Sequence, residues 1–339
     1  MFARKLAKGD PLYDRATLEQ YVRDDLALID EVKPDVIVAD FRLSLAVSAR
    51  IAKVRYANIS NAYWSSYYPI DGDWPMPELP VSRILPLPLG TKIFNWIRPL
   101  AFRQHCRPLE EVLRAAGLPD CGQDLRRVYT DSDLTLYADV PSLFALSGAP
   151  SNHRVIGPIA WSPPVPLPGW WSELPDSQPL AYVTLGSSGK GELAGSVAKS
   201  LCEAGFSVVL ATAGTANPPA MSGLYVEKYL PGDQAAARSD LVVCNGGSPT
   251  TQQALTAGKP VIGIANNLDQ FLNMRALERG GVGKVLRADR FDPRVLASTA
   301  RNLVENSVAR AKAGEVAAEI ARTDVTSVVY SLLRSEVFV

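Results

Sequence analysis

The sequence predicts an α/β protein made of two domains, and three observations support this. The chain has 339 residues, more than one compact hydrophobic core usually holds. Apolar runs such as 180–185 and 241–244 show no polar alternation, which is typical of parallel strands covered on both faces. Stretches with helical periodicity lie between such runs, so that strands and helices alternate as in βαβ units.

The composition indicates a globular protein without a nucleic-acid partner. Lys plus Arg and Asp plus Glu both number 35, the hydrophobic share is 47% and the charged share is 21%. No apolar segment is long enough to cross a bilayer, and the first ten residues lack the apolar core of a signal peptide. The cysteines show no paired spacing, which favours reduced thiols, a cytoplasmic location and no zinc site; they are Cys106, Cys121, Cys202 and Cys244.

The first half begins with an amphipathic helix over 14–32. A strand over 35–40, a helix over 44–52 and a strand over 55–59 follow as a βαβ unit. Asp40 stands at the end of the first strand, where an aspartate commonly caps the following turn. A doubly wound domain normally opens on a strand, a glycine turn and a helix, so we expect this domain to lack its initial elements.

Aromatic residues and prolines crowd the stretch 61–99, which predicts loops and short helices. The aromatic side chains either line a cleft for an apolar ligand or form a hydrophobic cluster on the sheet, and the two interpretations are equally favoured. A helix over 103–116 and a strand over 133–137 complete the half. The two histidines, His105 and His153, are expected to be surface or core residues.

The second half begins after a stretch rich in proline and tryptophan over 161–179, which we interpret as a linker. A strand over 180–185 leads into a Gly-Ser-Ser-Gly turn and a helix over 192–204. Strands over 207–211 and 224–228 follow. The turn can offer amides and hydroxyl groups to a phosphate, although such a loop alone is weak evidence.

The stretch 240–273 contains the clearest candidate site. A strand over 241–244 ends in Asn245, Gly246 and Gly247, and a helix should begin with Ser248 as N-cap and Pro249 at its first position. Unpaired amides at this helix start favour a phosphate. After a second strand over 261–264, short polar side chains suit sugar hydroxyls: Asn266, Asn267, Asp269, Gln270 and Asn273. An ordinary βαβ unit with polar loops explains the pattern as well.

These residues resemble the donor-binding signature of nucleotide-sugar-dependent glycosyltransferases of the GT-B fold, in particular macrolide-type enzymes related to the erythromycin pathway. The resemblance implies two Rossmann-like domains facing across a cleft. It assigns the diphosphate to Asn245, Gly246, Gly247, Ser248 and Thr250, the ribose to Gln253, and the hexose to Asp269 and Gln270. It also directs Gly186, Ser187 and Ser188 toward the donor, and Leu230 and Pro231 toward the base.

The sequence departs from the family pattern in three places. Asn245 stands where many members have His, and Gln253 where many have Glu. Both amides can still hydrogen-bond a phosphate or a ribose hydroxyl. Asp40 matches the carboxylate that orients a catalytic His in the family, but the turn that carries this His has no counterpart here.

The resemblance divides the chain into an incomplete acceptor-side domain (1–160), a linker (161–179), a donor-binding domain (180–322) and a helix returning to the first domain (323–339). It implies transfer of a hexosyl group from a UDP- or dTDP-sugar to a hydroxyl of a small, largely apolar acceptor, without a metal cofactor. Two alternatives remain: a protein that binds a nucleotide sugar without turnover, and, more weakly, another GT-B enzyme such as a sugar-nucleotide epimerase.

Overall fold

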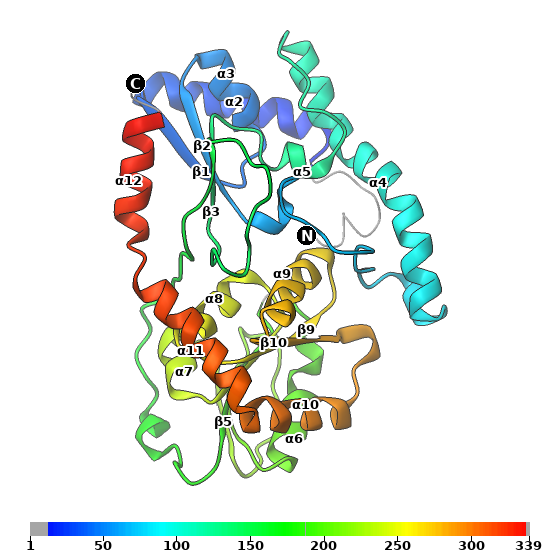
Figure 1. Cartoon of the computed structure of the whole chain (residues 1–339), viewed down its shortest axis with the longest axis vertical. Coiled ribbons are helices and arrows are strands. Elements are labelled where there is room, and N and C mark those ends of the chain that lie inside the picture. Colours follow the sequence, from blue (N-terminus) through cyan, green and yellow to red (C-terminus); the bar gives the residue numbers. More distant parts are fainter. Residues whose placement is uncertain (1–12, 187, 337–339) are drawn as a thin grey trace. The chain divides into compact units, whose positions relative to one another are not determined.

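The structure is a computed structural model that describes residues 13–186 and 188–336. It consists of two compact units (Figure 1). Unit 1 contains residues 13–74, 87–158 and 323–336, and unit 2 contains residues 75–86 and 159–322. The segment 75–86 therefore belongs to unit 2 although the chain passes through unit 1 both before and after it.

Unit 1 is built on a parallel sheet with the strand order β1-β2-β3-β4. Its strands are β1 (Val36–Asp40), β2 (Arg55–Ser60), β3 (Leu134–Tyr137) and β4 (His153–Val155). Its α-helices are α2 (Arg15–Val32), α3 (Leu45–Ala52), α4 (Leu87–Ala115), α5 (Leu125–Val128) and α12 (Val325–Glu336), and a 3-10 turn, η1, spans Ala62–Trp64.

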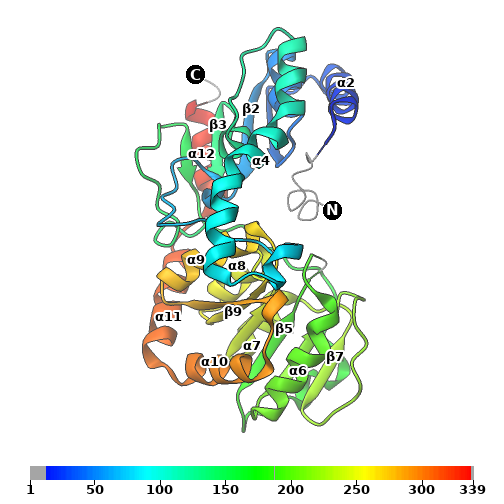
Figure 2. The same ribbon diagram turned by 90° about the vertical axis from the view of Figure 1, so that its right-hand side faces the viewer.

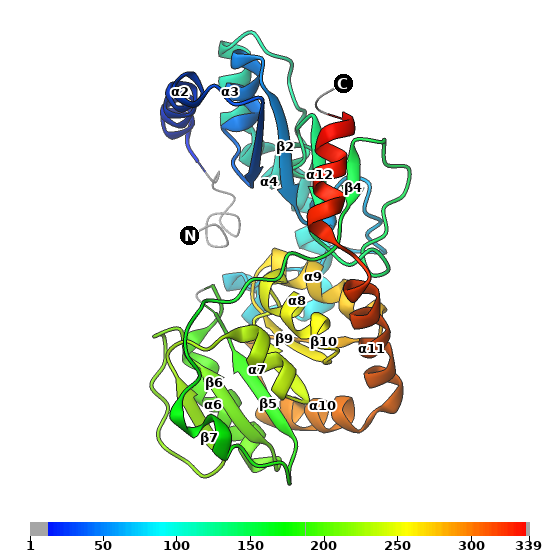
Figure 3. The ribbon, with the colours of Figure 1, turned by 90° about the vertical axis from the view of Figure 1, so that its left-hand side faces the viewer.

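Helices cover both faces of this sheet. On one face α12 packs on the buried side chains of Ala57, Leu134 and Leu136, as Figure 3 shows beside β2 and β4. Elsewhere Leu45 and Ala49 of α3 pack with Tyr56 of β2. The last helix of the chain is therefore part of the core of unit 1.

Two local predictions in unit 1 meet different outcomes. The helix expected over 14–32 is present, and the Asp14 side chain caps it by accepting from the Thr17 amide at 2.8 Å. The helix expected over 103–116 begins earlier than predicted, because α4 already starts at Leu87 and continues through Pro99 and Pro108. Prolines usually end helices, which favoured a start after Pro99. The predicted start was wrong, because the helix continues through this proline.

Unit 2 is built on a six-stranded parallel sheet with the order β10-β9-β8-β5-β6-β7. Its strands are β5 (Leu180–Thr184), β6 (Ser207–Ala211), β7 (Leu224–Glu227), β8 (Leu241–Cys244), β9 (Val261–Ala265) and β10 (Gly283–Arg287). Its α-helices are α6 (Ala194–Glu203), α7 (Gly232–Arg238), α8 (Ser248–Thr256), α9 (Leu268–Arg279), α10 (Pro293–Glu305) and α11 (Ser307–Ala321). Its 3-10 turns are η2 (Pro80–Arg83), η3 (Gly169–Glu173), η4 (Gly191–Leu193) and η5 (Ala288–Arg290). The order is that of a Rossmann fold.

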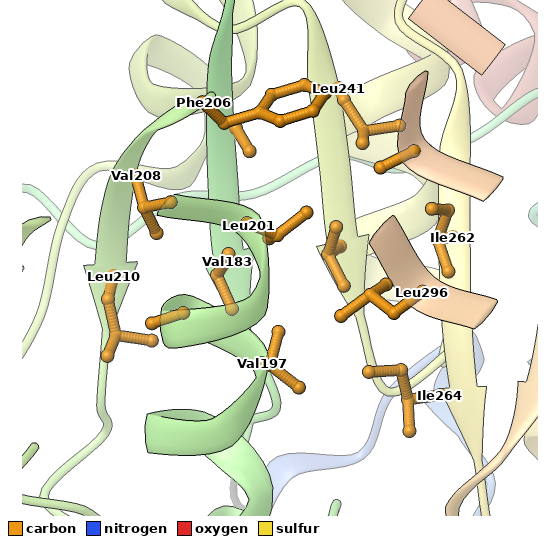
Figure 4. Close-up of a cluster of buried hydrophobic side chains, with 14 of the residues drawn as sticks. Val183, Val197, Leu201, Phe206, Val208, Leu210, Leu241, Ile262, Ile264 and Leu296 are labelled. Carbon is orange, nitrogen blue, oxygen red and sulfur yellow. The ribbon is translucent and has the colours of Figure 1, made fainter. Parts of the chain in front are cut away.

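The core of unit 2 explains why its strands are apolar along their whole length. On one face, side chains of α6 and α10 pack over the sheet, and Figure 4 shows Val197, Leu201 and Leu296 in the same cluster as Val183 and Leu241 of the strands. Figure 2 shows α6 and α10 beside the same sheet. Helices α7 and α8 pack against β5 and β8. Every residue of β5, β8 and β9 is buried, as the unbroken apolar runs predicted.

Candidate functional site

The candidate site lies where the strand order of unit 2 reverses. β5 and β8 are neighbours in the sheet, but the chain leaves β5 toward β6 on one side and leaves β8 toward β9 on the other. The turns after β5 and β8 therefore lie side by side at the carboxyl edge. Open α/β sheets bind their ligands in the crevice at such a point.

Asn245 joins the two turns. Its side chain is 7% exposed, and its Nδ2 donates to Oγ of Ser188 at 3.0 Å. Its Oδ1 accepts from the Gly247 amide at 2.9 Å. Asn245, predicted to hold a diphosphate directly, thus uses both ends of its amide to shape the turns. Ser187 lies outside the described residues, whereas Gly186 and Ser188 lie in the turn after β5.

Gly246 allows the close packing behind these turns. Its φ is +84°, and a Cβ at this position would lie 2.7 Å from Cγ of Met274. The Gly246 carbonyl accepts from Nδ2 of Asn273 at 2.9 Å, and the same nitrogen donates to Oγ1 of Thr251. Asn273 is 1% exposed, so this side chain ties α9 to the turn and to α8. No residue with a side chain fits at Gly246 without displacing Met274.

The amino end of α8 is capped differently from the prediction. Gly247 is the N-cap residue, and Ser248 and Pro249 are already within the helix, so the assignment of Ser248 as N-cap was one residue too late. Gly247 offers no side chain to the first-turn amides, and Thr250 is partly exposed. Helix-start amides together with the helix dipole favour an anion, so the chemistry expected of this turn is unchanged.

Gln253 contacts residues 161–162, near the start of the segment 159–322 of unit 2. The side chain is 9% exposed, and its Nε2 donates to the Trp161 carbonyl at 2.6 Å and to Oγ of Ser162 at 3.1 Å. The residues expected at the base, Leu230 and Pro231, are buried and lead into α7. Nε2 of Gln253 is therefore already bonded within unit 2, to residues near the start of the segment 159–322, and meets a ribose only if these bonds exchange.

The loop after β9 carries the polar cluster that the sequence predicts. Asn267 caps α9 by accepting from the Gln270 amide at 3.1 Å, and Oε1 of Gln270 accepts from the Asn266 amide at 2.9 Å. Asp269 lies in the first turn of α9, where a carboxylate interacts favourably with the helix dipole. Nε2 of Gln270 is buried and has no hydrogen-bond partner among the described residues.

A segment that sequence analysis did not connect with this site lies against it. We call residues 75–86 the strap. The Glu78 amide donates to the Asn266 carbonyl at 2.7 Å, and Lys190, which follows the turn after β5, donates to Oε1 of Glu78 at 3.0 Å. Glu78 thus contacts two of the loops that the sequence assigns to donor binding. No local pattern reveals this, because the contact to Lys190 spans 112 positions in the chain.

The strap is anchored by residues around the end of β10. Arg287 donates to the Met76 carbonyl at 2.7 Å and stacks over the Phe271 ring of α9 at 4.9 Å. Arg287 also pairs with Asp289, and Ser82 donates to the same carboxylate. Although burial opposes ionisation, these hydrogen bonds from Arg287 and Ser82 hold the pKa of Asp289 below its ordinary value. Arg290 donates to the carbonyls of Ser82 and Leu85.

The candidate catalytic carboxylate lies in unit 1, in a less enclosed setting. Asp40 ends β1 with an exposed side chain, and partial desolvation raises its pKa above the ordinary value. Both histidines have other partners: His105 hydrogen-bonds Tyr129 at 3.1 Å, and His153 hydrogen-bonds Tyr137 at 2.7 Å. Burial lowers the pKa of His153. The structure thus gives no pairing of Asp40 with a histidine within the described residues.

Comparison with known proteins identifies the family. Residues 222–333 match the model of the erythromycin biosynthesis protein CIII-like C-terminal domain. A PGL/p-HBAD biosynthesis glycosyltransferase of Mycobacterium tuberculosis H37Ra is 45% identical over 316 residues, which cover 92% of this chain and 73% of the relative. The chain belongs to this glycosyltransferase family. A PGL/p-HBAD biosynthesis rhamnosyltransferase of Mycobacterium bovis BCG is 44% identical, with 92% of this chain and 70% of the relative covered.

Two further matches bear on fold and activity. The spinosyn rhamnosyltransferase SpnG has a TM-score of 0.67 at 18% identity, covering 97% of this chain and 80% of that one, and it has also been solved in complex with thymidine diphosphate. The α/β glycosyltransferase fold of GT-B type predicted from the sequence is thereby confirmed. An inactive PGL/p-HBAD biosynthesis glycosyltransferase of Mycobacterium bovis BCG is 44% identical over 185 residues, covering 55% of this glycosyltransferase and 50% of that relative.

Neither a cluster of metal-ligating side chains nor a membrane-spanning helix is found in the described part of this glycosyltransferase. Within residues 13–186 and 188–336, no three His, Cys, Asp or Glu side chains gather as a metal site would require. In the same residues, no helix combines the length and the apolar character that a membrane span needs.

Proposed function

We propose that this glycosyltransferase transfers a hexosyl group from a UDP- or dTDP-sugar to a hydroxyl group of a small, largely apolar acceptor. The observation that carries the proposal is the pair of turns at the switch point, joined by the bond from Asn245 to Ser188 and placed at the start of α8. The polar loop after β9 adds side chains that suit a hexose. The names of the relatives, a rhamnosyltransferase among them, support a hexose-type donor.

The proposed donor arrangement follows from these positions. The diphosphate lies against the amides of Gly247, Ser248 and Thr250, with the Ser188 hydroxyl beside it. The hexose lies toward Asp269 and Gln270. Gln253 reaches the ribose only if its bond to the Trp161 carbonyl exchanges for one to the sugar. Leu230 and Pro231 flank the base. Thymidine diphosphate bound to the similarly folded SpnG supports a nucleoside diphosphate as ligand.

The proposed reaction forms one bond and breaks another at the anomeric carbon. The acceptor oxygen attacks that carbon and loses its proton to a base, while the bond to the diphosphate oxygen breaks and the diphosphate leaves with its added charge. In this proposal the amides at the start of α8 bind the diphosphate of the donor. The same amides stabilise the charge that develops on the leaving diphosphate in the transition state. We assign no metal to the reaction, because these amides meet the same electrostatic need.

Asp40 is the proposed carboxylate on the acceptor side. Its raised pKa fits a group that takes part in proton transfer, since a carboxyl that ionises less readily is a stronger base. The aromatic side chains of Tyr63, Trp64 and Trp74 are buried and pack against one another, so these three residues form the hydrophobic cluster that the sequence offered as one alternative and present no surface to an acceptor.

The experiment is a turnover assay of the purified chain with UDP- and dTDP-hexoses and a panel of phenolic and macrolide acceptors, followed by mass spectrometry. A glycosylated acceptor and free nucleoside diphosphate in equal amounts are expected. An isomerised donor without a glycosylated acceptor would instead indicate an epimerase.

Binding without turnover is the second candidate. Both histidines of the chain are hydrogen-bonded to tyrosines, so neither is assigned as the catalytic base. Donor binding in calorimetry with no product over the whole acceptor panel would favour this candidate over the transferase.

A further inference from the structure

Glu78 of the strap is a partly buried carboxylate with only one of its oxygens paired among the described residues. Oε1 accepts from Lys190 at 3.0 Å and from Arg83 at 2.8 Å. Oε2 is buried and has no hydrogen-bond partner among the residues that the structure describes. The side chain is 14% exposed. A buried carboxylate oxygen without a hydrogen bond is unfavourable, so Oε2 is a candidate acceptor for a hydrogen bond from a bound ligand.

The second incomplete group lies on the same loop. Nε2 of Gln270 is buried without a partner in the described chain, and Gln270 is 1% exposed. Glu78 and Gln270 are both fixed to Asn266: the Glu78 amide donates to its carbonyl, and its amide donates to Oε1 of Gln270. Asn266 therefore bonds both the residue that carries the unpaired acceptor and the residue that carries the unpaired donor.

The two unpaired groups are complementary to a hydroxyl. A hydroxyl can donate one hydrogen bond and accept another, whereas a phosphate oxygen would be repelled by the Glu78 carboxylate. We propose that Glu78 is a sugar-recognition residue that accepts a hydrogen bond from a hydroxyl of the donor hexose, with Gln270 donating to the same hydroxyl. This inference rests on the proposed function, and it adds a residue from the first half of the chain to the donor site.

The proposal has a consequence for specificity. A hexose that lacks the hydroxyl leaves Oε2 unpaired, so the site discriminates against the corresponding deoxy sugar. Both unpaired atoms are covered by protein, so we expect the loop after β9 to shift when the hexose binds. Lys190 and the anchoring of the strap keep Glu78 at the loop, and the strap thereby acts as a fixed wall of the sugar site.

The test compares nucleotide and sugar-nucleotide binding by calorimetry in the whole chain. UDP and dTDP are titrated beside their hexose conjugates, and the ratio of the two dissociation constants gives the affinity that the sugar adds. We expect Glu78→Gln to leave the nucleotide dissociation constant unchanged and to reduce the sugar's added affinity about tenfold, the loss expected for one hydrogen bond to a charged group.

Two control variants separate this role from a structural one. Arg83 pairs with Glu78 at the surface, and the Arg83 side chain is 61% exposed. Arg83→Ala should therefore change neither the nucleotide nor the sugar-nucleotide dissociation constant. Glu78→Gln should have little further effect in a Gln270→Leu background, because both residues bind one hydroxyl. Thermal unfolding of each variant verifies that it is folded.

The outcomes are distinguishable. Equal losses of nucleotide and sugar-nucleotide affinity in Glu78→Gln, or an unchanged added affinity, would overturn the role of Glu78 while leaving the proposed function intact. Failure of the folded, unaltered chain to bind any of the nucleotides or sugar nucleotides would overturn the proposed function, and the role of Glu78 with it.

Discussion

The carboxyl ends of β8 and β1 have similar sequences and different surroundings. Both strands are apolar runs that end in a short polar residue, Asn245 after β8 and Asp40 in β1. β8 is buried throughout and has β5 and β9 as neighbours, whereas within the described chain β1 pairs with β2 alone and is only partly covered. Asn245 is enclosed by bonds to a second turn, and Asp40 is exposed.

The difference teaches that a polar residue at a strand end makes a site only when neighbouring elements complete it. At β8 the turn after β5, α9 and the strap all contribute hydrogen bonds. At β1 the local sequence is equally suggestive, but the structure shows a partly desolvated carboxylate without such a frame. The following predictions test this comparison, beginning with the largest effect.

Gly246→Ala should strongly destabilise unit 2. The variant combines a positive φ with a Cβ 2.7 Å from Met274 Cγ, for which we expect a loss of ~4 kcal/mol in the free energy of unfolding. Gly72→Ala is the matched control, since Gly72 also has a positive φ but has nothing within 4 Å of its Cβ position. It should lose only ~1 kcal/mol. Urea unfolding of both variants measures the difference, and equal losses would mean that the Met274 contact is unimportant.

Asp289→Asn should loosen the strap in a pH-dependent way. The Asp289 side chain is 0% exposed and paired with Arg287, so we expect a loss of ~3 kcal/mol near pH 7. Because the folded-state pKa of Asp289 is lowered, its stabilisation is present above the unfolded value of about 3.9 and is lost as the pH falls through the folded value. Urea unfolding at several pH values should show the variant and the original chain converging in acid.

A surface ion pair provides the control for this experiment. Glu111 pairs with Arg107 on α4, where the two side chains are 29% and 75% exposed. Glu111→Gln should change the free energy of unfolding by less than about 0.5 kcal/mol at any pH. If Asp289→Asn behaves in the same way, the strap is held by something other than this buried pair.

Asp269→Ala and Asp40→Asn should separate donor binding from turnover. We expect Asp269→Ala to weaken sugar-nucleotide binding about tenfold and nucleoside diphosphate binding less, through loss of a hydrogen bond to the hexose. Asp40→Asn should lower kcat and leave the dissociation constant of the donor unchanged. Equal loss of both ligands in Asp269→Ala would show that its role is to stabilise α9.

Chelation should have the smallest effect. If the α8 amides stabilise the departing diphosphate, EDTA should leave the initial rate of transfer unchanged. A rate that falls with EDTA and returns on addition of Mg²⁺ would contradict this assignment.

The sequence predicted much of the fold of unit 2 because its signals are local. The apolar run 241–244 coincides with β8, and the run 261–264 falls one residue short of β9, which ends at Ala265. The start of α4 was missed because Pro88 and Pro99 lie in its first half, and a stretch with prolines and crowded aromatic residues favours loops and short helices. Its carboxyl half buries Phe102, Cys106 and Leu109, and this packing supports a helix that local propensity argues against.

The site was predictable only in part, for a related reason. Asn245 and Gly246 were singled out as ligand contacts because a glycine turn before a helix has a recognisable pattern. In the structure the Asn245 side chain instead joins two turns, and the lack of a side chain at Gly246 leaves room for Met274. The contact between Glu78 and Lys190 has no local signal, because the two residues are 112 positions apart and meet only when the strap packs on the rest of unit 2.

The most direct test of the central claim is calorimetric titration of the purified chain with UDP, dTDP and their hexose conjugates. We predict saturable binding that weakens in Asn245→Ala, because this variant removes the bonds to Ser188 and Gly247 and so disorders the turns at the start of α8. Absence of binding by a folded chain, or binding unaffected by Asn245→Ala, would contradict a donor site at the β5 and β8 turns.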